Sequence, residues 1–136
     1  MNTVQVVEAI KRKFVETGSP ARIPKLKGGS FTAELTDEGV KVDNLGSLPF
    51  LPWAAFLEAV DIMIQNGGRA KRGNAYNKLG GPGLPTDSIE GHVAYVVYGK
   101  KKGESVFRRI TPIACILIWA SICKPVPNEL VFRELA

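Results

Sequence analysis

Two segments of the chain repeat apolar residues at the spacing of an α-helix. In residues 3–16 and 52–66, apolar side chains return every three or four positions and polar side chains occupy the opposite face. This spacing predicts two amphipathic helices, each of which covers a core with one face. Gly18 and Pro20 follow the first segment and Gly67 follows the second, so the helices should end there.

A third segment, residues 112–123, is apolar on every side and carries no charge. Thr111 can cap a helix here, and Pro112 suits its first turn because that position needs no backbone N–H. Twelve residues span only about 18 Å, which is too short to cross a membrane of about 30 Å. We therefore predict a central buried helix that its own chain or a second copy must cover.

Two segments alternate apolar and polar residues in the manner of strands. Residues 30–45 do so around the turn residues 36–39, which predicts a β-hairpin. Residues 89–110 are rich in β-branched and aromatic residues and contain a Gly/Lys-rich turn at 99–103, which predicts a second hairpin. Residues 129–135 are expected to form a closing strand.

These elements predict an α+β fold in one domain, residues 1–136. We expect a mostly antiparallel sheet of four to five strands, built from the two hairpins, with the helices packed on one face. Each hairpin is followed by a helix that begins with proline, and several helix residues match at an offset of sixty positions. The order therefore suggests a ββα pseudo-repeat.

The net charge of +5 is concentrated in one part of the chain. Residues 1–68 carry seven Lys or Arg and eight Asp or Glu, whereas residues 69–109 carry nine and three. Residues 110–136 carry two of each kind. A local excess of positive charge is typical of a surface that meets an anionic partner.

The excess charge predicts a nucleic-acid-binding surface formed by a basic loop, residues 69–87, and the tip of the second hairpin. Lys and Arg would contact phosphates, and one tyrosine could stack on a base. The candidate residues are Arg69, Lys71, Arg72, Tyr76, Lys78, Lys100, Lys101, Lys102, Arg108 and Arg109. We expect non-catalytic binding of DNA or RNA without sequence-specific readout, because no predicted helix carries the charge.

The alternative is a homo-oligomeric structural or protein-interaction module that binds no nucleic acid. Three lysines at a hairpin tip are equally typical of a soluble, protected sheet edge, and a loop rich in Lys, Gly and Asn is typical of disorder. A helix without a polar face favours a homodimer, in which the same helix pairs across a two-fold axis. This expectation holds for either function.

The sequence offers little support for catalysis, although it does not settle whether the chain is an enzyme. His92 is the single histidine and stands near Glu90 on a predicted strand, where the two side chains would share a face, but two ligands do not make a metal site. Cys115 and Cys123 lie too far apart on one helix to bridge. We therefore predict no catalytic set, metal or cofactor, and no membrane partner. Reduced cysteines and an N-terminus unlike a signal peptide favour the cytoplasm.

Overall fold

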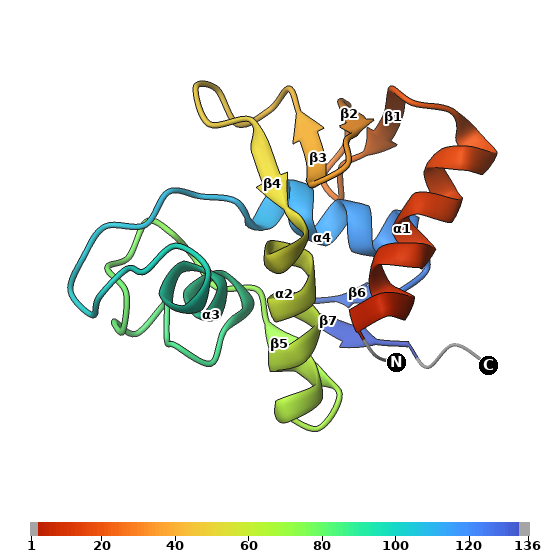
Figure 1. Ribbon diagram of the computed structural model, residues 1–136. Coiled ribbons are helices and arrows are strands. Elements are labelled where there is room, and N and C mark those ends of the chain that lie inside the picture. Colours follow the sequence, from red (N-terminus) through yellow and green to blue (C-terminus); the bar gives the residue numbers. More distant parts are fainter. Residues whose placement is uncertain (1–2, 134–136) are drawn as a thin grey trace.

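The computed structural model describes residues 3–133, which form an α+β fold with four helices and two antiparallel sheets (Figure 1). The predicted class is confirmed. In chain order the elements are α1 (Thr3–Thr17), β1 (Ala21–Pro24), β2 (Ser30–Leu35), β3 (Gly39–Val42), β4 (Phe50–Pro52), α2 (Trp53–Gln65), β5 (Arg69–Lys71), α3 (Ile89–Val96), α4 (Ile110–Trp119), β6 (Cys123–Val126) and β7 (Glu129–Phe132). No helix in this part of the chain has the length and hydropathy needed to span a bilayer.

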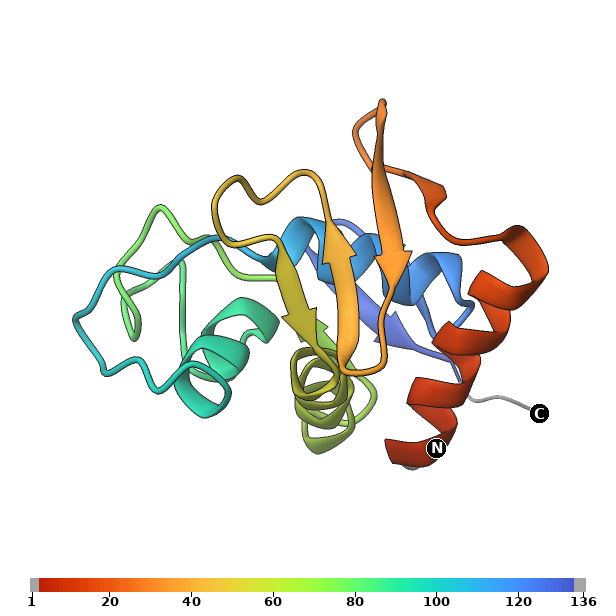
Figure 2. The same cartoon turned by 45° about the horizontal axis from the view of Figure 1, so that its top comes forward.

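The first sheet contains the predicted hairpin and extends it on both sides. Its strands run in the order β1-β2-β3-β4, each antiparallel to its neighbour (Figure 2). Phe31 and Ala33 of β2 are buried and alternate with exposed or half-buried residues, as the period of a strand requires. Neither β1 nor β4 was predicted, because each is short and contains a proline at its end.

The second sheet has the order β5-β7-β6, so the last strand of the chain lies in the middle. The structure therefore has two antiparallel sheets where the sequence predicted one, and that part of the prediction is wrong. Residues 69–71, assigned to a loop, form β5 because Arg69 and Lys71 pair with β7. The closing strand ends at Phe132, and the last residues of the predicted range 129–135 lie outside the described residues.

Helix α4 is the central helix, and its own chain covers it. It packs against α1, α2, β1 and β6, between the two sheets in Figure 1. Trp119 also makes an edge-on contact with Phe14 of α1, with 4.8 Å between ring centroids. Because Ile113, Ile116 and Leu117 are fully buried within one chain, α4 gives no reason to expect a homodimer.

The boundaries of α4 differ from the predicted range 112–123. The helix begins at Ile110, so Thr111 lies in its first turn and Arg109 takes the N-cap position. The expected threonine cap is not formed, and the carboxylate of Glu90 instead accepts the backbone N–H of the N-cap residue Arg109 at 2.7 Å. The helix ends before Ser121, whose φ of 62° is left-handed, and the chain then enters β6.

The predicted second hairpin, residues 89–110, is wrong, because residues 89–96 form helix α3. Ser88 caps this helix: its Oγ accepts the backbone N–H of Gly91 at 3.1 Å. Ile89 and Val93 are buried one helical turn apart, so helical spacing overrides the strand-like composition. The rest of the segment, 97–109, is irregular, and the ββα pseudo-repeat is not confirmed.

The irregular segments 72–88 and 97–109, which precede and follow α3 in the sequence, pack against each other, and we call residues 72–109 the loop lobe (Figures 1 and 2). Its small apolar cluster contains Leu79, Leu84, Ala94 and Val106. The backbone of Leu79 donates to the carbonyl of Glu104 at 3.0 Å and accepts from Gly103 at 2.8 Å. The long basic segment is therefore an ordered part of the fold.

Candidate nucleic-acid interface

A groove of about 1180 Å3 opens where five parts of the chain meet. One side is the turn between β1 and β2, residues 25–27, and another is the chain that follows β5, residues 71–76. The remaining parts are residues 82–85 of the loop lobe, Arg108 with the first turns of α4, and residues 125–128, which are the end of β6 and the turn after it. The groove depends on the tertiary fold, because most of these segments are far apart in the sequence.

Five cationic side chains line this groove, and no Asp or Glu of the described residues lines it. They come from three segments of the chain and are Lys25, Lys27, Lys71, Arg72 and Arg108. Cations gathered around a concave surface focus a positive potential into it. The groove is therefore suited to an anionic ligand.

Tyr76 presents an aromatic ring at the groove. Its side chain is 87% exposed, and the guanidinium of Arg108 lies 5.8 Å from the ring centroid. A local turn sets its backbone, because Asn74 Oδ1 accepts the N–H of Tyr76 at 3.0 Å. The N–H of Asn74 in turn donates to the carbonyl of Gly83 at 2.9 Å. An ordered loop thus carries an exposed ring beside a cation.

Apolar residues form another part of the groove lining. Ile110, Ala114 and Cys115 contribute from α4, and Val126 contributes from the end of β6. Burial raises the pKa of the Cys115 thiol, although a backbone hydrogen bond with Leu26 and the charges of Lys25 and Arg72 act in the opposite direction. The thiol therefore stays protonated at neutral pH and acts as an apolar wall residue.

Glu90 joins the segments that carry two of the groove cations. Its backbone N–H donates to the carbonyl of Arg72 at 3.0 Å, and its carboxylate accepts from the backbone of Arg109 at 2.7 Å. The side chain of Arg109 is buried and stacks on Tyr98, with 3.6 Å from the guanidinium carbon to the ring centroid. Arg72 and Arg108 therefore have a common support beneath the surface.

Burial also changes the acidity of the Glu90 carboxyl group. Loss of solvation raises the pKa of Glu90 from 4.5 to about 7, although the hydrogen bond and charge of Arg109 and the charge of Arg108 lower it. A carboxyl whose pKa is higher in the folded state binds protons more tightly there. Its contribution to stability is thus fully present below about pH 4.5 and declines as the pH rises through about 7.

Replacing Glu90 with glutamine should remove this pH dependence. Glutamine keeps an oxygen that can accept from Arg109 but cannot ionise, so Glu90→Gln should be more stable than the unchanged protein at about pH 8, by about 1–3 kcal/mol. Urea unfolding at several pH values measures this difference. Glu34→Gln, at an exposed position of β2, serves as the control and should keep the original pH dependence. Parallel profiles for Glu90→Gln and the unchanged protein would contradict the assignment.

The structure brings together four of the ten sequence-predicted site residues in the groove: Lys71, Arg72, Tyr76 and Arg108. Arg69 instead forms an ion pair with Glu129 of β7 at 2.6 Å. Arg109 is buried, so it cannot belong to an exposed binding surface as predicted. Sequence reasoning missed Lys25 and Lys27, which reach the groove from the β1–β2 turn.

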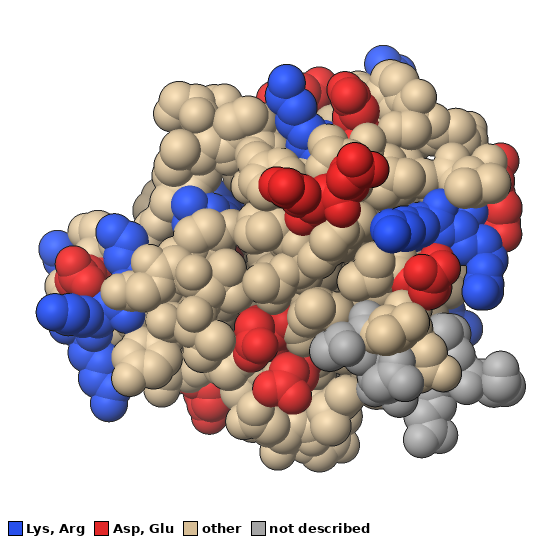
Figure 3. Space-filling view, viewed as in Figure 1, with Lys and Arg blue, Asp and Glu red and all other residues tan. Residues whose placement is uncertain are grey.

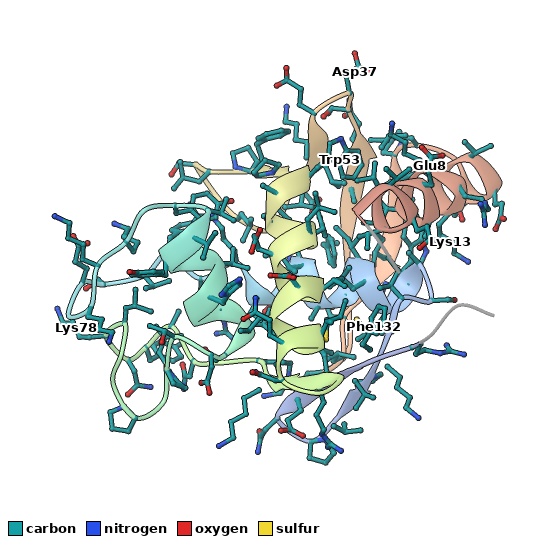
Figure 4. All side chains as sticks on the ribbon, turned by 60° about the horizontal axis from the view of Figure 1, so that its bottom comes forward. Glu8, Lys13, Asp37, Trp53, Lys78 and Phe132 are labelled. Carbon is teal, nitrogen blue, oxygen red and sulfur yellow. The ribbon has the colours of Figure 1, made fainter. Side chains whose placement is uncertain are left out.

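The other predicted lysines belong to a second basic region at the outer end of the loop lobe: Lys78, Lys100, Lys101 and Lys102. Lys78 Nζ donates to Ser105 Oγ at 3.3 Å, which links the two irregular segments. Figure 3 shows Lys and Arg gathered at this edge of the molecule, and Figure 4 places Lys78 there. None of these four lysines lines the groove.

His92 and Glu90 do not form the pair expected on a strand. Residues two apart on a helix point in nearly opposite directions, and His92 Nε2 instead meets Glu58 Oε1 of α2 at 2.9 Å. Asp61 lies close enough for the three side chains to surround a cation, with donor atoms within 4.8 Å of one another. Asp61 already accepts from Gln65 at 2.7 Å, so we interpret the cluster as a polar link between α2 and α3.

Comparison of the chain with protein-family models, with curated proteins and with solved structures found no match. The function must therefore be argued from the groove itself. Its cations, its exposed ring and its apolar wall are the features that a ligand would meet.

Proposed function

We propose that the chain is a non-catalytic nucleic-acid-binding domain that holds phosphates in this groove. The observation that carries the proposal is the convergence of five cations from three segments of the chain, with no carboxylate among the described lining residues. Each cation can neutralise one phosphate, and the gain comes largely from released counterions. A regularly spaced polyanion can satisfy several such contacts at once.

The groove is broad enough for an extended ligand, because its lining comes from five segments between the β1–β2 turn and the turn after β6. The thiol of Cys115 is not a candidate nucleophile in this groove, because burial raises its pKa. A protonated thiol is a poor nucleophile.

The test is fluorescence anisotropy with short labelled oligonucleotides at about 50 mM and about 200 mM salt. Five phosphate contacts on a single strand give a log–log salt slope of about −3.5, so affinity should fall about 100-fold between the two conditions. Absence of binding at the lower salt, or binding that ignores salt, would refute the proposal. A poly-glutamate competitor tests the alternative of an acidic protein partner, and displacement of the oligonucleotide at matched charge would favour that alternative.

Two parts of the sequence-based expectation stay predictions. A homodimer would place two grooves on one particle. Light scattering of the purified chain measures the molar mass and so tests this prediction directly. A cytoplasmic location agrees with two cysteines that are free and buried in the structure, Cys115 and Cys123.

A further inference from the structure

We infer that the ligand of the groove is a single-stranded nucleic acid, and that one of its bases stacks on Tyr76 beside Arg108. This inference rests on the proposed function and specifies the form of its ligand. Three observations support it: the exposed ring of Tyr76, the apolar lining of the groove, and the contacts of the basic residues of α1 with tryptophan rings.

The ring of Tyr76 is available to a ligand. The side chain is 87% exposed, whereas Tyr98 is partly buried under the guanidinium of Arg109. An aromatic face next to a cation binds a nucleobase by stacking and holds the adjoining phosphate by charge. Only an unpaired base offers its face, so this feature favours a single strand.

The lining of the groove points to the same form of ligand. Pro125, Val126 and Pro127 give the groove exposed apolar surface close to its cations, whereas Ile110 and Ala114 line it but are almost fully buried. A duplex presents phosphates and sugars outward and keeps its base faces stacked inside, so it has little apolar surface to match. A single strand exposes both kinds of surface to the same groove.

The helices give little support to duplex recognition through a major groove. Among the described helices, only α1 contains Lys or Arg. Two of these side chains lie over tryptophan rings. Lys11 Nζ lies 5.8 Å from the ring centroid of Trp53, and Lys13 Nζ lies 5.8 Å from that of Trp119. A recognition helix needs such side chains free to reach base edges.

The experiment measures binding of matched single-stranded and double-stranded oligonucleotides by the full chain and three variants. Tyr76→Ala should weaken single-strand binding about 5- to 150-fold without changing the salt slope, because stacking is lost and phosphate contacts stay. Tyr76→Phe should retain the affinity of the unchanged chain. Tyr95→Ala is the matched control, since Tyr95 is 53% exposed on α3 and does not line the groove.

The outcomes separate this inference from the proposed function. Binding of neither oligonucleotide would refute both. Salt-dependent binding with equal or higher affinity for the duplex would overturn the inference alone, and so would a Tyr76→Ala variant that binds a single strand normally. Because Tyr76 is exposed, the variant should fold, and its urea unfolding midpoint checks this directly.

Discussion

Replacing Lys71 and Arg108 together with glutamine should weaken single-strand binding about 60-fold at about 50 mM salt. Each lost phosphate contact removes about 0.7 from the log–log salt slope, so the slope should fall by about 1.4. Both side chains are exposed and line the groove from different segments, which should leave stability within about 0.5 kcal/mol. Anisotropy titrations across a salt series give both quantities.

The control carries the same change of charge outside the groove. Lys101→Gln with Lys102→Gln removes two exposed lysines from the outer end of the loop lobe, where neither lines the groove. Its affinity should stay within about 3-fold of the unchanged chain, because only long-range attraction is lost. A larger loss in this control than in the groove variant would place the binding surface at the outer end of the loop lobe instead of in the groove.

Replacing Gly91 with alanine should destabilise the protein by more than about 3 kcal/mol. A Cβ at this position would overlap the backbone carbonyl of Pro85 and press on Ser88 Oγ, which caps α3. Backbone atoms cannot move away as a flexible side chain can, so the start of α3 would have to shift. That shift would disturb Glu90 and the segments that it joins.

A second glycine separates this overlap from the general effect of adding a methyl group. Gly99 has a φ of +66° but no atom within 4 Å of an added Cβ, so Gly99→Ala should cost only about 1–2 kcal/mol, from its backbone alone. Urea unfolding of both variants makes the comparison. Equal losses would show that the Pro85 contact is not the cause.

The sequence predicts most of the regular structure because local spacing decides it. Residues 3–16 and 52–66 show a clear helical period, and the hairpin within 30–45 has an evident turn. The prediction of a second hairpin was wrong because it gave more weight to the β-branched composition of the segment than to its helical spacing. The Ser88 cap and the interval between Ile89 and Val93 were the available signals of a helix.

The site was harder to predict because charge counted along the sequence differs from charge gathered in space. Lys25 and Lys27 fall in a part of the chain that is slightly acidic overall, yet the described lining of the groove includes none of its carboxylates. Arg69 looked like its basic neighbours, but its partner Glu129 lies sixty residues away. Only the tertiary fold shows which of these cations are paired, which are buried and which line the groove.

Titration of an isotope-labelled sample with a short single-stranded oligonucleotide, followed by amide NMR, tests most directly whether nucleic acid occupies the groove. The largest shifts should fall at residues 25–27, 71–76 and Arg108, which line it together. Shifts confined to Lys78 and residues 100–102, or spectra that do not change, would contradict the account.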